Sequence, residues 1–113
     1  MFKRKRTKIA EYLRSAPGTV FAQLLSDWYG GTMHSELEAL GLTKLDDHID
    51  WLPDYKCIGI QARYGKLYVD IQIDQKEFTI AADEDEPDEP SEFPLLSADD
   101  FYETVRRYLE KLR

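Results

Sequence analysis

The sequence contains few of the residues that build common catalytic and metal sites. It has one cysteine, Cys57, and two histidines, His34 and His48, in 113 residues. One cysteine forms no intramolecular disulfide and does not supply the paired thiolates of a structural zinc site. The sequence also lacks a glycine-rich phosphate loop and a nucleophile elbow. We therefore expect no cofactor, no metal and no enzymatic activity.

Long apolar segments are missing as well. No stretch approaches the roughly 20 apolar residues that a membrane-spanning helix needs. The basic residues near the N-terminus are not followed by the apolar region of a secretory signal. A chain with a single cysteine suits a reducing compartment. These absences predict a cytosolic protein that does not bind membranes.

Charge is abundant but unevenly distributed. Charged residues make up 33% of the chain and hydrophobic residues 42%, which is typical of a folded domain, and the net charge is -7. Residues 1–14 contain six basic side chains and one acid, a charge of +5, so the remainder carries -12. We expect this acidic body to repel nucleic acid and anionic membranes and to attract a protein with a basic surface.

Apolar spacing predicts three short helices in the first forty residues, after a flexible basic arm over 1–6. The first covers 7–14, the second starts at a Thr19 cap and covers 19–29, and the third covers 33–40. For 19–29 an extended conformation is the alternative. The expected inward residues are Ile9, Tyr12, Leu13, Phe21, Leu24, Leu25, Trp28, Met33, Leu37 and Leu40.

From about Lys44 the pattern changes to the alternation of strands. It predicts strands over 45–52, 56–63, 66–73 and 77–82, with tight turns at Tyr64-Gly65 and Asp74-Gln75. Short turns between successive strands produce antiparallel neighbours, so we expect a meander of three or four strands. Gly59 inside a strand indicates a bulge or a close backbone approach.

The last thirty residues combine an acidic loop with an amphipathic helix. Residues 83–94 contain seven acids and three prolines, which exclude a helix or a central strand. Ser97 then caps a helix whose apolar stripe is Phe101, Val105, Tyr108, Leu109 and Leu112. We predict one α+β domain over 1–113, with the helices packed on one apolar sheet face.

The N-terminal third resembles the start of a winged-helix domain. Ile9 to Leu13, followed by Pro17 and Gly18, resembles the first helix and turn, and 32–41 resembles a recognition helix. The resemblance implies DNA binding. However, segment 32–41 carries two acids, Glu36 and Glu38, and no lysine or arginine for phosphate contacts. We therefore do not assign the chain to that family.

Three small groups of residues have a chemical and a structural interpretation. Asp46, His48 and Asp50 project from one face of a strand and offer oxygen and nitrogen ligands to a divalent ion. Strand alternation alone produces the same pattern, and we favour that interpretation. His34 and Glu38, one helical turn apart, suit a surface ion pair better than a shared metal. Cys57 suits packing better than nucleophilic catalysis.

Two surfaces are candidates for binding a partner. The first is the acidic loop, with Asp83, Glu84, Asp85, Glu86, Asp88 and Glu89, whose carboxylates can imitate a phosphate backbone. The second is the polar sheet face, which includes Arg63 and Tyr68. We predict a non-enzymatic module that binds a basic protein surface, similar in composition to immunity-type inhibitors of toxins. Alternatives are a nucleic-acid-associated regulator using residues 3–6, and an enzyme using Asp46, His48 and Asp50.

Overall fold

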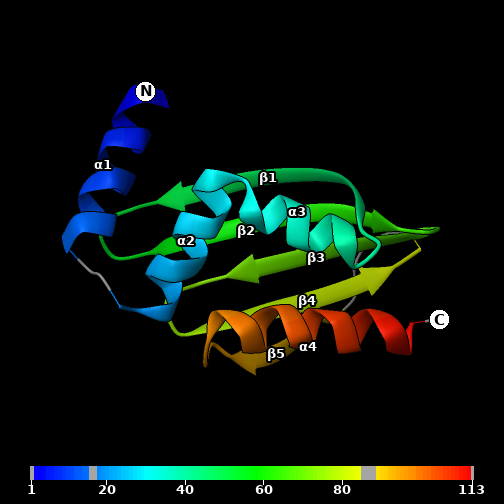
Figure 1. The fold of residues 1–113 in the computed structure, drawn as a ribbon. Helices are drawn as coiled ribbons and strands as arrows, with labels where there is room; N and C mark the ends of the chain where they lie inside the picture. The colour runs from blue at the N-terminus through cyan, green and yellow to red at the C-terminus, as the bar shows by residue number, and fades with distance from the viewer. Residues whose placement is uncertain (1, 16–17, 85–88, 113) are drawn as a thin grey trace.

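The described residues form four helices and five strands in a computed structural model (Figure 1), which confirms the predicted α+β class. It describes residues 2–15, 18–84 and 89–112, with side chains from Lys8 onward. The helices are α1 (Phe2–Ser15), α2 (Val20–Gly30), α3 (Thr32–Ala39) and α4 (Ala98–Lys111). The strands are β1 (Thr43–Trp51), β2 (Lys56–Tyr64), β3 (Leu67–Ile73), β4 (Glu77–Asp83) and β5 (Ser91–Pro94).

Each strand of the sheet pairs antiparallel with its neighbour in the sequence, in the order β1-β2-β3-β4-β5. The turn between β2 and β3 is Gly65-Lys66, one residue later than predicted. Gly65 has φ +61, which glycine adopts without steric cost. In the next turn the Asp74 carboxylate accepts the backbone N–H groups of Lys76 at 2.8 Å and Glu77 at 2.6 Å. These local contacts hold the predicted meander in register.

The predicted loop over 83–94 contains a fifth strand, so the expectation of three or four strands was one too low. β5 pairs with residues Glu77 to Ile80 of β4, and the rings of Phe93 and Phe78 stack with centroids 5.3 Å apart. β5 is an edge strand, and an edge position tolerates the proline that ends it. The acids and prolines correctly excluded a central strand, but they concealed the edge strand that places Phe93 against the core.

The helices begin close to the predicted residues, except α1. That helix starts at Phe2, so part of the segment predicted as a flexible arm belongs to it. Residues 20–30 are helical rather than extended, and the Thr19 hydroxyl accepts the N–H of Ala22 at 3.1 Å. The Ser97 hydroxyl accepts the N–H of Asp100 at 3.0 Å. Both predicted caps are therefore confirmed.

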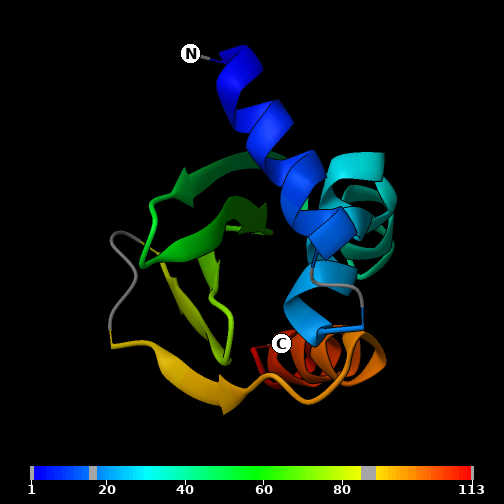
Figure 2. The ribbon, with the colours of Figure 1, turned by 90° about the vertical axis from the view of Figure 1, so that its left-hand side faces the viewer.

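The hydrophobic core lies between the helices and one face of the sheet. Seen along the strands, the sheet curves around this core with the helices on its concave side (Figure 2). Phe101 of α4 packs edge-on against Phe78 of β4, with ring centroids 4.8 Å apart. Tyr102 donates a hydrogen bond of 2.8 Å to Asp27, which joins α4 to α2. No helix in the described part of the chain is long and apolar enough to cross a bilayer.

Candidate functional site

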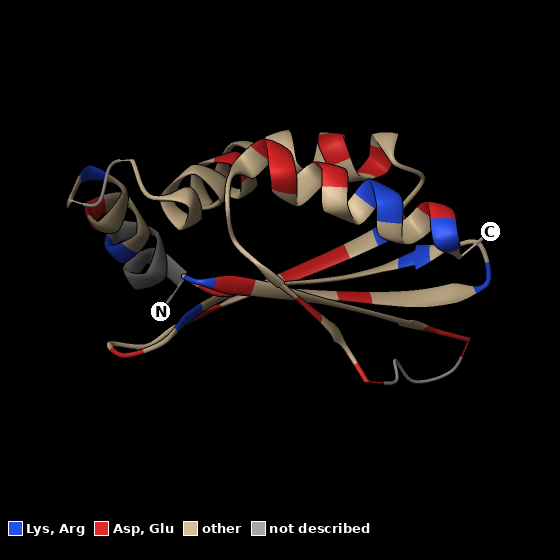
Figure 3. Ribbon diagram, turned by 90° about the horizontal axis from the view of Figure 1, so that it is seen from below, with Lys and Arg blue, Asp and Glu red and all other residues tan. Residues whose placement is uncertain are grey.

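The sheet has a second face that no described helix covers, which we call the open face. Figure 3 shows α2, α3 and α4 on the other side of the sheet and α1 at one end of it. Strand alternation and register assign the members of the open face. They are Asp46, His48, Asp50, Cys57, Gly59, Gln61, Arg63, Tyr68, Asp70, Gln72, Glu77, Thr79, Ala81, Asp83 and Glu92.

One row across the open face joins the two surfaces that the sequence offered separately. Arg63 of β2 pairs with Tyr68 of β3, and Tyr68 pairs with Asp83 of β4. The guanidinium carbon of Arg63 lies 3.9 Å from the centre of the Tyr68 ring. Asp83 is also the first residue of the predicted acidic loop. The structure therefore brings Arg63 and Tyr68 together with the start of that loop.

The other predicted loop residues divide into two groups. Glu84 and Glu89 are exposed, and the Glu84 N–H donates to Asp83 Oδ1 at 2.6 Å. Asp85, Glu86 and Asp88 lie outside the described residues. The strands of the open face therefore contribute the part of the candidate surface that has a defined geometry.

Among the residues that the structure describes, the carboxylates of the open face have no cationic partners. Six acids occupy it: Asp46, Asp50, Asp70, Glu77, Asp83 and Glu92. Among the described residues, no lysine or arginine lies at ion-pair distance from any of them. The basic member of the face, Arg63, lies over Tyr68 and donates to the backbone oxygen of Lys66 at 3.3 Å. The open face thus presents uncompensated negative charge.

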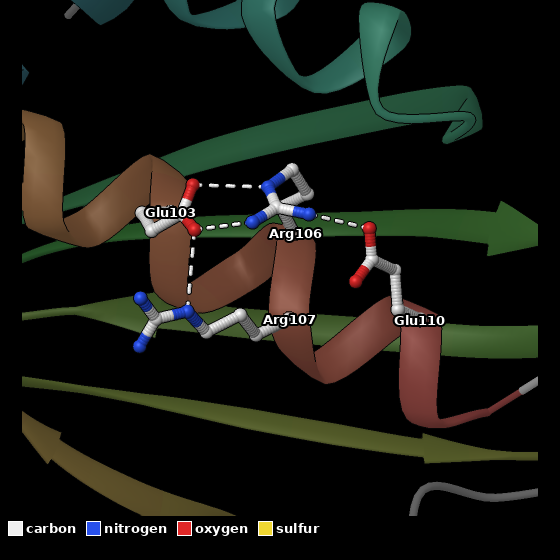
Figure 4. Close-up of polar contacts among 4 residues, drawn as sticks. All are labelled: Glu103, Arg106, Arg107 and Glu110. Carbon is white, nitrogen blue, oxygen red and sulfur yellow. Dashed lines mark hydrogen bonds and ion pairs between the residues drawn. The ribbon is translucent and has the colours of Figure 1, made fainter.

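On the outer surface of α4, two acids form ion pairs with arginines of the same helix (Figure 4). Glu103 accepts hydrogen bonds from Arg106 and Arg107, and Arg106 also contacts Glu110. The hydrogen bond from Arg106 is the main reason that the pKa of Glu103 falls to about 2. Glu103 and Glu110 are thus paired with bases one turn away, as in many solvent-facing helices. The charges on α4 are largely balanced, whereas those on the open face are not.

Asp46, His48 and Asp50 share the open face of β1, as strand alternation predicted. In the described part of the chain, no three His, Cys, Asp or Glu side chains are arranged to hold a metal ion. The His48 imidazole lies over Gly59, the residue opposite it on β2, where a Cβ atom would overlap the ring. The predicted close approach at Gly59 is therefore confirmed, and the approaching group is a side chain.

Cys57 is 1% exposed and sits on the open face beneath longer polar side chains. Its thiol donates to Gln72 Oε1 at 3.2 Å, and Gln72 Nε2 donates to Asp70 Oδ1 at 3.0 Å. Burial raises the pKa of the Cys57 thiol, which disfavours the thiolate that a nucleophile requires. The pKa of Tyr55 rises to about 12, mainly because of its hydrogen bond with Cys57. These contacts agree with the packing interpretation of the cysteine.

His34 has a different partner from the one the sequence indicated. Its Nε2 lies 3.5 Å from Asp47 Oδ2, and the same carboxylate accepts the indole N–H of Trp28. No described contact links His34 to Glu38. Asp47 points toward the helices, so this cluster ties α2 and α3 to β1 and is not part of the open face. The i, i+4 spacing pointed to Glu38 within the same helix, whereas the observed partner, Asp47, lies on β1.

Two basic residues of α1 have described side chains. Lys8 and Arg14 are exposed on α1, at the end of the sheet opposite the turn between β2 and β3 (Figure 1). The side chains of residues 3–6 lie outside the described set. No protein-family model, curated protein or solved structure matches the chain.

Proposed function

We propose that this protein is a non-enzymatic binding module whose open face engages a basic surface of another protein. The observation that carries the proposal is the set of six carboxylates, without described cationic partners, on an uncovered sheet face. Like charges held near one another on a sheet repel, and a cationic partner relieves that repulsion. Complementary charge also accelerates encounter and selects the partner.

The contrast with α4 supports a specific role for the open face over a general need for solubility. Solubility alone is served by exposed charge anywhere on the surface, whereas Glu103 on α4 is engaged by Arg106 and Arg107. The acids of the open face have no such basic partner among the described residues, and they are held on strands, which fix their spacing. An inhibitor of a basic enzyme or toxin in the cytosol is one class of protein with this arrangement.

The proposal is tested with a short lysine-rich peptide and two variants that lose the same charge. The first variant, Asp46→Asn with Asp50→Asn, Asp70→Asn and Asp83→Asn, changes the open face. The second, Glu11→Gln with Glu36→Gln, Glu38→Gln and Asp54→Asn, changes exposed acids elsewhere. We expect the first variant to weaken binding about tenfold at low salt and the second to change it much less. Fluorescence anisotropy of the labelled peptide provides the dissociation constants.

Two results would contradict the proposal. Equal losses for both variants would show that net charge, and not the open face, determines binding. Binding of an oligonucleotide duplex at low salt, abolished by deleting residues 1–6, would favour the alternative of a nucleic-acid-associated regulator. A variant with Asp83, Glu84, Asp85 and Glu86 neutralised separates the contribution of the loop from that of the strands.

A further inference from the structure

Tyr68 is an exposed aromatic residue on the open face, with 45% of its surface accessible. Arg63 covers one side of its ring from β2, at 3.9 Å from the ring centre. Arg63 is itself fixed, because its Nη2 donates to the backbone oxygen of Lys66 in the adjoining turn at 3.3 Å. Since Arg63 approaches from β2, the opposite side of the ring is turned toward β4.

Asp83 of β4 is the residue paired with Tyr68 on that opposite side. One of its carboxylate oxygens accepts the N–H of Glu84, and no described base contacts the other. Asp70 follows Tyr68 by two residues on the same face of β3 and adds a second carboxylate. The uncovered side of the ring is therefore bordered by negative charge, whereas the covered side already holds a cation.

This arrangement suits a guanidinium better than an ammonium group. A guanidinium is planar, so it stacks on an aromatic ring while its edge donates two parallel hydrogen bonds to a carboxylate. A lysine ammonium has no plane to stack and interacts as a compact, strongly hydrated charge. Within this chain, the guanidinium of Arg63 already lies over one side of the Tyr68 ring.

We propose that Tyr68 and Asp83 form a subsite for an arginine side chain of the protein partner. The inference rests on the proposed function and specifies its chemistry: the arginine stacks on the side of the Tyr68 ring opposite Arg63 and pairs with Asp83. The other carboxylates of the open face attract the rest of the basic segment. The basic α1 of the same molecule lies at the other end of the sheet, so it does not fill the subsite (Figure 1).

The test compares two capped peptides of equal length and charge, one of arginine and glycine and one of lysine and glycine. We expect the wild-type protein to bind the arginine peptide about threefold to fivefold more tightly at low salt, as one cation–π contact predicts. Tyr68→Leu should remove this preference, and Tyr68→Phe should retain it because the ring remains. Asp83→Asn should reduce the preference. The control Asp50→Asn, at the far end of the open face, should weaken both peptides equally.

The outcomes separate this inference from the proposed function. If both peptides bind with equal affinity, or if Tyr68→Leu leaves the preference intact, the arginine subsite is wrong while the proposed function stands. If neither peptide binds, the proposed function fails as well. Sedimentation velocity of the protein alone identifies a third case. Concentration-dependent association that Tyr68→Leu abolishes would show that a second copy of this chain fills the subsite, which overturns the assignment to another protein.

Discussion

The two faces of the sheet are formed by alternate residues of the same strands, yet they differ in almost every property. The face toward the helices is lined by residues such as Ile58, Ile71 and Phe78, and the described residues include no buried polar or charged side chain. The open face carries amides, acids, Arg63 and Tyr68. The comparison indicates that the covered face stabilises the fold, which leaves the open face free for recognition.

The acids of α4 and those of the open face also differ in whether they have basic partners. On α4, Glu103 and Glu110 have arginine partners within the same helix. On the open face, the six carboxylates have none among the described residues. The carboxylates at these two places therefore differ in their availability to a partner, because Glu103 and Glu110 already contact arginines.

The largest expected effect on the free energy of unfolding distinguishes the two faces of one strand, β4. Phe78→Ala should lower the free energy of unfolding by about 3–5 kcal/mol, because it removes a ring packed against Phe93 and Phe101. Its neighbour Thr79 lies on the open face, and Thr79→Ala should change the same quantity by no more than about 0.5 kcal/mol. Urea denaturation of both variants provides the measurement. Similar losses would mean that the open face also contributes packing.

An intermediate effect is expected where the open face is most closely packed. Gly59→Ala should displace the His48 imidazole from its rotamer and cost about 1 kcal/mol. In a His48→Ala background the same change should instead stabilise the protein, since alanine restricts the unfolded chain more than glycine does. A double-mutant cycle by chemical denaturation measures this reversal of sign. Additive effects would show that His48 does not lie over Gly59 in solution.

The smallest expected effect on stability comes from neutralising a paired acid, Glu103, compared with an unpaired one. The pKa of Glu103 falls from 4.5 to about 2, so its ion pairs stabilise the fold above pH 4.5 and lose that contribution as the pH falls toward 2. Glu103→Gln should therefore lower stability slightly at pH 7, and the difference from wild type should vanish near pH 2. Water screens the pair, since Glu103 is 40% exposed.

Asp46→Asn is the matched control for that measurement. Asp46 is exposed on the open face and has no described basic partner. Its neutralisation should leave stability unchanged or raise it at low salt, because it removes a like charge from the face. Thermal melts of both variants at two salt concentrations test the contrast, and a loss of stability for Asp46→Asn would contradict it.

The sequence predicted the elements of this fold better than it predicted the contacts between them. Alternation located four strands, and capping residues located α2 and α4. β5 was not predicted, because its pairing depends on the contact between Phe93 and Phe78, which local composition does not reveal. The same limit applies to the site. Arg63, Tyr68 and Asp83 were each candidates, but only the register between strands shows that they form one row.

The order of the strands has a consequence for how the chain folds. Because every strand pairs with its neighbour in sequence, each hairpin closes a short loop and the sheet can grow one strand at a time. The hydrogen bond between Asp27 and Tyr102 spans 75 residues and forms only when α4 docks against α2. We therefore expect a transition state in which the hairpins are already formed and the last helix is still free, so that changes in α4 act mainly on the rate of unfolding.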